Sequence, residues 1–144
     1  MERSERPASV ETFEHTADVG LVVRAATLEA LFAGAADGLV ALTIDPAGLR
    51  DDEHERVSIT AADRAALLVA WLNEIVYLLD TRGFLPRRCR IVEVTDTTLT
   101  AELAGDIVDR TRHDVRRMVK AATYHGLSLV QTGAGWEARV ILDL

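Results

Sequence analysis

The chain has 144 residues and a mass of 15.7 kDa, enough for one domain that buries about 70% of its unfolded surface. With 49% hydrophobic and 27% charged residues and only three prolines, the composition excludes a disordered, collagen-like or low-complexity chain. The net charge of −7 argues against a free-standing binder of DNA or RNA backbones, so any RNA contact is expected to run through a partner or a local patch.

Cysteine usage and hydropathy indicate the compartment. The single cysteine, Cys89, excludes an internal disulfide and a paired-cysteine metal or redox motif, suits a reducing cytosol and is expected to pack in the core. The first residues lack the apolar segment of a secretory signal, and the most apolar stretch, residues 67–79, falls short of the ~20 residues of a membrane span. The sequence therefore predicts a cytoplasmic protein without membrane contact.

The N-terminal part predicts a tail followed by two strands. Residues 1–8 are polar and predict a flexible tail before a domain over residues 9–144. A strand is expected around residues 10–15, and the β-branched run 20–25 predicts a neighbouring strand. The polar turn between these strands, residues 15–18, is then a place where chemistry could occur.

A first helix follows the second strand. Thr27 is a plausible N-cap, and apolar residues recur behind it at helical spacing until Asp45 and the following proline, which predicts one apolar stripe that covers one face. The acidic segment 51–55 is expected to be a solvated loop, and the alternation in residues 57–59 predicts a half-buried strand.

The second helix is predicted to be central. Thr60 followed by Asp63 resembles a capping box. Behind it, residues 67–79 are apolar almost all round, which is typical of a helix enclosed by other elements. Gly83 then indicates a turn.

The remaining chain predicts mainly strands. Residues 89–94 and 99–103 alternate and suggest a hairpin, residues 105–114 suggest a polar loop, and residues 119–130 and 136–142 suggest two further strands. The total is six to eight strands and two helices without regular βαβ alternation. This pattern favours an α+β fold, with two helices packed on mainly antiparallel sheet layers.

Sequence motifs for common chemistry are absent. The chain has no dinucleotide-binding glycine motif, P-loop, HExxH, nucleophile elbow or EF-hand loop. The remaining candidates are polar residues at the ends of strands.

Two aspartates and the last residue are candidates for a cation site. Asp18 lies in the predicted turn, where it could ligate a hard metal or accept hydrogen bonds from turn amides. Asp143 follows an apolar run and precedes Leu144, whose α-carboxylate could join both aspartates if the last strand ends beside Asp18. Such a cluster implies a cation, a proton or a basic neighbour, whereas the alternative is a frayed, solvated terminus.

Three further residues could bind or transfer protons. Lys120 either points to solvent or supplies a positive charge to an anion or to the aspartates. His125 and His113 could act as bases or donors, although a lone histidine near a strand end is more often structural.

Polar residues on the second helix and a basic segment complete the candidates. Asn73 and Glu74 mark either the exposed side of the helix, which is the default, or polar groups aimed at a pocket. A cluster of positive charges could bind phosphate or an acidic partner, or could form a solvated face. Its members are Arg110, Arg112, Arg116, Arg117 and Lys120.

Four blocks of the sequence stand out together. They are FEHTADVG (residues 13–20), LLVAWLNEIVYLLD (67–80), VKAATYH (119–125) and ILDL (141–144). In these residues and in this order the chain resembles the archease family, small proteins that assist an RtcB-type RNA ligase. The resemblance spans nearly the whole chain from about residue 10 and implies a single archease-type α+β domain.

The resemblance implies a function that composition and spacing do not. An archease promotes guanylylation of the ligase's active-site histidine by GTP, so that the ligase turns over many times in tRNA splicing or RNA repair, and it does not itself join RNA. A divalent cation, expected to be Ca²⁺, would be held by Asp18, Asp143 and an oxygen of Leu144, and oxygen ligands suit such an ion. Lys120 would face the same site, with His125 and Glu74 as further functional candidates.

Two other classes of function stay open. A chaperone-like or general protein-binding module, without dependence on GTP or metal, would also suit an acidic surface without a catalytic motif. A free-standing metal-dependent enzyme has less support, because the sequence offers no nucleophile and base at a suitable spacing.

Overall fold

The computed structural model describes residues 7–14 and 17–144, with Glu14 described by its backbone alone. Most of the predicted tail, and His15 and Thr16 of the predicted turn, lie outside the described residues. Pro7 and Ala8 are described, and Ala8 packs partly against the core.

The described residues form seven strands, two α-helices and one short 3₁₀ helix. In chain order they are β1 (Ser9–Glu14), β2 (Asp18–Ala25), α1 (Leu28–Thr43), η1 (Pro46–Gly48), β3 (Glu53–Thr60), α2 (Arg64–Arg82), β4 (Phe84–Val94), β5 (Thr98–Ile107), β6 (Ala121–Thr132) and β7 (Gly135–Asp143). No described helix is long and apolar enough to cross a membrane.

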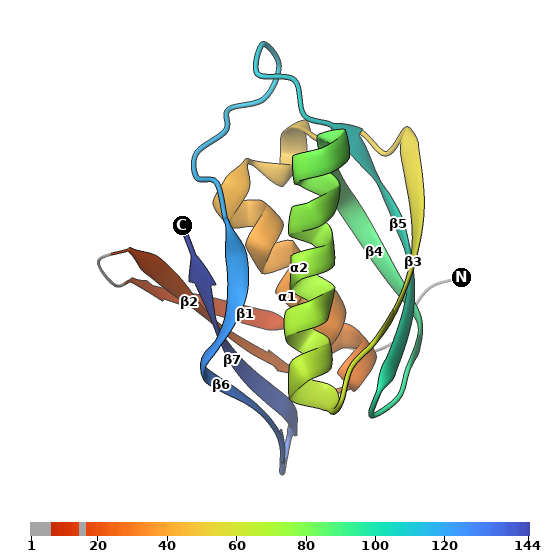
Figure 1. Cartoon of the computed structure of the whole chain (residues 1–144), viewed down its shortest axis with the longest axis vertical. Helices are drawn as coiled ribbons and strands as arrows, with labels where there is room; N and C mark the ends of the chain where they lie inside the picture. The colour runs from red at the N-terminus through yellow and green to blue at the C-terminus, as the bar shows by residue number, and fades with distance from the viewer. Residues whose placement is uncertain (1–6, 15–16) are drawn as a thin grey trace.

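The strands form two antiparallel sheets, with both helices between them (Figure 1). The four-stranded sheet has the order β1-β2-β7-β6, and the three-stranded sheet has the order β3-β5-β4. Both helices contact both sheets. The predicted α+β class with two helices on antiparallel layers is therefore confirmed, and each sheet keeps one face toward the helices and one toward solvent.

Helix α1 is more enclosed than its sequence suggested. Thr27 is the N-cap, as predicted, and its hydroxyl accepts a hydrogen bond from the Ala30 N–H at 3.1 Å. The prediction of a single apolar stripe was wrong, because residues 30–36 are all buried. A Cβ at Gly34 would overlap Ala8, so the small residues of the helix let the chain before β1 pack closely on it.

Helix α2 begins and ends at well-defined caps. Asp63 alone is the N-cap, accepting from the Ala66 N–H at 2.8 Å, while Thr60 belongs to β3, so the predicted capping box was wrong in its first residue. Gly83 ends the helix with a φ of 68°, a left-handed conformation that favours glycine. Tyr77 is 58% exposed, so α2 is less enclosed than predicted.

Two predicted loops are partly strands. The acidic segment 51–55 contributes its last residues to β3, which begins at Glu53, and β5 continues to Ile107 through part of the predicted loop 105–114. Cross-strand pairing explains both differences, since Glu53 pairs with Gly105 across the two strands. Neither segment has the apolar alternation that marks a strand in sequence.

Cys89 packs against the core from β4, as predicted. Burial raises the pKa of its thiol above the ordinary value, and the charge of Asp37 adds to that effect. The thiol is therefore protonated and unreactive near neutral pH.

Candidate functional site

The register of the four-stranded sheet brings the candidate residues to one edge. Asp18 at the start of β2 lies directly opposite Asp143 at the end of β7, and Asp143 lies opposite Ala121 of β6. Directly opposite residues of an antiparallel pair share one face, with Cβ atoms about 4.5–5.5 Å apart. The two aspartates are therefore neighbours on the same face.

Main-chain hydrogen bonds fix this edge. The Lys120 N–H donates to the Asp143 carbonyl oxygen at 2.7 Å, and the Leu144 N–H donates to the Ala17 carbonyl oxygen at 3.3 Å. The segment after β7 is thus tied to the residue before β2 rather than frayed.

Asp18 carries an unsatisfied oxygen. Its Oδ1 is buried and has no hydrogen-bond partner among the described residues. A buried carboxylate oxygen without a donor is costly, and the cost rises with the second carboxylate beside it. Within residues 7–14 and 17–144 no group of three or more histidine, cysteine or acidic side chains is placed to hold a metal ion. A cation at this edge would therefore have two carboxylates and main-chain oxygen as its protein ligands. An all-oxygen set of this kind suits a hard cation.

A small cavity lies next to Asp18 on the outer face of the sheet, the face turned away from the helices. It has a volume of about 250 Å³ and is lined by Phe13, Asp18, His125, Gly126, Arg139 and Ile141. Residues opposite one another across β1, β2 and β7 explain this lining, since Phe13, Gly20 and Ile141 form one row beside the row of the two aspartates.

The wall of this cavity is built from an aromatic ring and a guanidinium. A Cβ at Gly20 would overlap the Phe13 ring, so the ring can occupy this position only because residue 20 is glycine. The guanidinium carbon of Arg139 lies 4.8 Å from the centroid of the Phe13 ring, a cation–π distance.

An irregularity in β6 shapes the opposite wall. The pairing of β6 with β7 is interrupted between Thr123 and Ser128, and Gly126 adopts a φ of 65° there. Such bulges change where side chains point. His125 lies in this segment and lines the cavity, while Tyr124 is 67% exposed.

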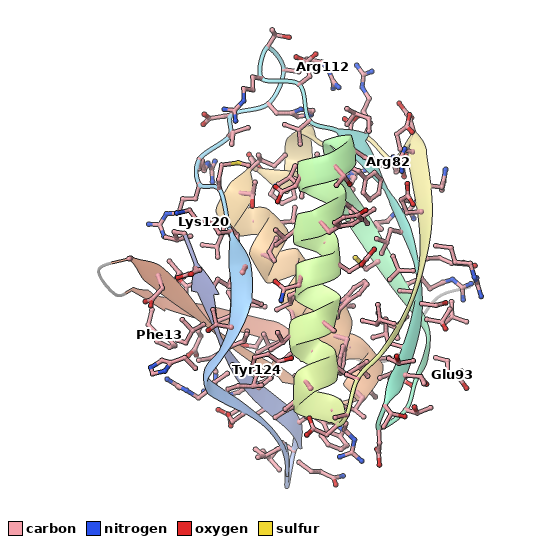
Figure 2. All side chains as sticks on the ribbon, viewed as in Figure 1. Phe13, Arg82, Glu93, Arg112, Lys120 and Tyr124 are labelled. Carbon is pink, nitrogen blue, oxygen red and sulfur yellow. The ribbon has the colours of Figure 1, made fainter. Side chains whose placement is uncertain are left out.

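The other predicted candidates occupy different positions. The side chain of Lys120 is exposed and makes no ion pair with a described residue. In Figure 2 Lys120 and Phe13 lie on the side of the four-stranded sheet, and Glu93 lies on the opposite side of the molecule. Glu74 is half-buried on α2, which packs on the inner face of the sheet and not on the face with the cavity.

The prediction that Asn73 lies on the exposed side of α2 was wrong. Its side chain accepts from the Ala122 N–H at 2.7 Å and donates to the Ala122 carbonyl oxygen at 3.2 Å, so it is not on the exposed side of α2. These bonds hold β6 against the helix beside the aspartate edge.

His113 and part of the basic segment have structural roles. Nδ1 of His113 accepts from the Asp109 N–H at 2.9 Å, and Nε2 lies 3.2 Å from the Gly48 carbonyl oxygen, as expected for a structural histidine. Arg112 forms an ion pair with Asp106 at 3.4 Å. Arg116 lies 3.9 Å from Asp114, so the positive charges are partly neutralised locally.

Neither Arg139 nor Phe13 was predicted from the sequence as a site residue. The signal was present, because Arg139, Ile141 and Asp143 alternate with buried residues in β7 and therefore share its outer face. What the sequence could not show is that Phe13, from a strand more than 120 residues earlier, lies beside them.

The fold and this edge define a two-sheet α+β domain with paired acidic residues where β2 and β7 meet. A similar fold occurs in the solution structure of Methanobacterium thermoautotrophicum protein 1598, with a TM-score of 0.77, 33% identity and coverage of 94% of this chain and 98% of that chain. The crystal structure of a Thermotoga maritima archease, described as a possible chaperone, matches with a TM-score of 0.63 over both whole chains, and its 19% identity supports the fold alone.

Sequence comparison gives the family. The model of the Archease protein family (MTH1598/TM1083) matches residues 11–144. The protein archease of Thermococcus gammatolerans is 33% identical over 138 residues, covering 93% of this chain and 97% of the relative, and that of Methanosarcina acetivorans is 30% identical, covering 93% and 94%. The chain belongs to the archease family.

Proposed function

We propose that this protein is an accessory activator of an RtcB-type RNA ligase. It would promote GTP-dependent guanylylation of the ligase's histidine and so allow multiple turnover in tRNA splicing or RNA repair in the cytoplasm. The observation that carries the proposal is the pairing of Asp18 with Asp143, with Asp18 Oδ1 buried and without a described partner. Membership of the archease family supports it.

Asp18, Asp143 and an oxygen of Leu144 would hold a divalent cation, for which Ca²⁺ is our first expectation. A bound cation would neutralise the two carboxylates and attract negatively charged ligand oxygens. The sheet register and the Leu144 to Ala17 hydrogen bond hold these groups in place before a ligand arrives, which limits the ordering cost on binding.

Lys120 would add positive charge from the adjacent start of β6. Its backbone is fixed by the bond to Asp143, while its exposed side chain is free to reach a partner's nucleotide. In this proposal the ligase carries out the covalent chemistry and contacts the RNA, and this chain supplies charge and position. His125 at the cavity and Glu74 on α2 remain secondary candidates.

A ligation time course tests the proposal. RNA is supplied in large molar excess over an RtcB-type ligase from the same source, with GTP, and with or without this protein. We expect the wild type to convert a single stalled round into many rounds and Asp143→Asn to lose most of that effect. Glu137→Gln is the matched control, because it removes a carboxylate from the same strand and face. Equal stimulation by Asp143→Asn and wild type would contradict the proposed role of the site.

A second function, a chaperone-like binding module, is favoured by one surface observation. Tyr77 and Tyr124 expose 58% and 67% of their surface, and such aromatics are common in protein contacts. This function predicts suppression of aggregation of unrelated unfolded proteins without GTP or Ca²⁺. The same Asp143→Asn variant separates the two functions, because it should leave chaperone activity unchanged.

A further inference from the structure

Two arginines on the outer face of the four-stranded sheet differ in their partners. Arg24 on β2 forms ion pairs with Glu11 at 3.1 Å and with Glu137 at 3.5 Å. Arg139 on β7 lies one row nearer the aspartates and makes no ion pair with a described residue. The Glu11 carboxylate, which is in the same row as Arg139, is already bound to Arg24. Arg139 therefore presents a positive charge that the described chain does not neutralise.

The position of the Arg139 guanidinium is fixed by a neighbouring aromatic ring. The Phe13 ring supports its guanidinium at 4.8 Å, and Gly20 provides the space in which that ring lies. A stacked guanidinium loses less conformational freedom on binding than a free one, and its N–H groups stay available at the edge of the fork. These groups border the cavity that contains Asp18.

The charges around the cavity select an anion. This step rests on the proposed function, because it takes a cation to be bound at Asp18 and Asp143. A cation held by Asp18 and Asp143 would neutralise the carboxylates, and Asp18 shares the lining of the cavity with Arg139 and His125. An oxyanion in the cavity would then meet the positive charges of the cation and of Arg139.

The size and shape of the cavity limit the ligand. Its volume of about 250 Å³ lies below the roughly 300–1,000 Å³ of pockets that enclose a whole small molecule. It admits one tetrahedral anion with some water, while the rest of the ligand stays outside. A guanidinium binds the oxygens of an anion such as phosphate through two parallel hydrogen bonds, which an uncharged group does not match.

We propose that this cavity binds the terminal phosphoryl group of a larger phosphate ester, with Arg139 as the phosphate-binding residue beside the cation at Asp18 and Asp143. Two sources share this chemistry, a nucleoside triphosphate and an RNA end that carries a 3′-phosphate. In this proposal Arg139 helps to determine which ligand binds at the aspartate edge.

Calorimetric titration of the whole protein tests the proposal with four probes in the presence and absence of Ca²⁺. The probes are inorganic phosphate, GTP, an RNA oligonucleotide with a 3′-phosphate and the same oligonucleotide with a 3′-hydroxyl. We expect binding of at least one phosphate-bearing source in Ca²⁺, weaker binding without Ca²⁺, and no binding of the 3′-hydroxyl RNA. The source that binds more tightly than inorganic phosphate is the one that the cavity serves.

Variants distinguish Arg139 from the general charge of the surface. Arg139→Gln should weaken phosphate binding at least tenfold and Arg139→Lys less, because lysine keeps the charge without the planar fork. Arg24→Gln, on the same face but outside the cavity, should bind as the wild type does. Equal binding by Arg139→Gln and wild type would overturn the proposal, as would binding of the 3′-hydroxyl RNA that is as tight as that of the tightest phosphate-bearing probe.

A separate Ca²⁺ titration keeps the two proposals apart. If wild type and Arg139→Gln both bind Ca²⁺ but neither binds any phosphate probe, the assignment of Arg139 fails while the cation site stands. If Asp143→Asn binds Ca²⁺ as tightly as wild type does, the proposed cation site fails. Phosphate binding lost in Arg139→Gln would then still support Arg139 as the phosphate-binding residue, without the cation beside it.

Discussion

Two aspartates in different regions of this protein differ in the hydrogen-bond partners of their carboxylates. Asp106, near the end of β5, accepts hydrogen bonds from the Arg50 N–H at 3.0 Å and the Ile107 N–H at 2.9 Å, and it faces both Arg112 and His113. Asp18, at the start of β2, has a buried Oδ1 without a described partner. One carboxylate is stabilised by the chain, and the other is left for something outside it.

The difference shows in the titration of Asp106. Burial alone would raise the pKa of its carboxyl, but the hydrogen bonds from Arg50, Arg112 and Ile107 and the charge of Arg112 outweigh it and hold the pKa below its ordinary value. The chain can therefore place donors around a carboxylate where structure requires them. Their absence at Asp18 is what we expect of a ligand-binding edge rather than a structural one.

The largest expected effect is at the satisfied carboxylate. Asp106→Asn keeps the shape of the side chain but removes the negative charge that interacts with Arg112 and with the backbone donors. We expect it to lower the free energy of unfolding by about 2 kcal/mol. Chemical denaturation measures this change. Asp114→Asn is the control, since that side chain is 85% exposed and should show almost no change. Equal losses in the two variants would mean that the hydrogen bonds of Asp106 do not stabilise the fold.

The same variant gives a pH test. Because the pKa of Asp106 is lower in the folded than in the unfolded chain, its stabilisation is fully present above about pH 4 and is lost as the pH falls through the folded value. The difference in unfolding free energy between wild type and Asp106→Asn should therefore shrink on acidification below about pH 4. If the difference grew below about pH 4 instead, the pKa of Asp106 would be raised, not lowered, in the folded chain.

The next effect has the opposite sign. In cation-free buffer Asp18→Asn should leave stability unchanged or raise it by up to about 1 kcal/mol, because it removes one of two adjacent carboxylates. Addition of Ca²⁺ should then raise the melting temperature of the wild type but not that of Asp18→Asn, since a ligand stabilises only the form that binds it. A marked loss of stability without Ca²⁺ would show that Asp18 has a structural role like that of Asp106.

The smallest effect belongs to the outer face of the three-stranded sheet. Glu102 on β5 lies between Arg56 at 2.7 Å and Arg90 at 2.6 Å, and their hydrogen bonds lower its pKa. All three side chains are exposed, so salt screens the network and its members lose freedom to form it. Glu102→Gln should lower the melting temperature less than Asp106→Asn does, and the small difference should vanish in high salt.

Local signals account for the parts of the fold that the sequence predicts. The cap at Thr27 and the apolar spacing of both helices are encoded within a few residues of where they act. The proximity of Asp18 to Asp143 was predictable as a possibility, because both stand at strand ends. The metal role of these residues stays a prediction.

Features that depend on partners distant in sequence were not predicted. Asp106 lies in a polar segment that becomes strand only by pairing with β3 and β4, and Asn73 interrupts an apolar helix because β6 packs beside it. In both cases the side chain satisfies a backbone group from far away in the chain. A single sequence contains no local pattern for that relation.

The Asn73 contact also affects whether another chain can pair with the edge of the sheet at β6. β6 is an outer strand of its sheet, and an outer strand offers unpaired N–H and carbonyl groups to which another chain can add. Asn73 occupies both groups of Ala122, and the irregularity after Thr123 interrupts the strand further along. A second molecule therefore finds no continuous template along β6, which protects this edge of the sheet from pairing with another chain while the neighbouring aspartates stay open to a partner.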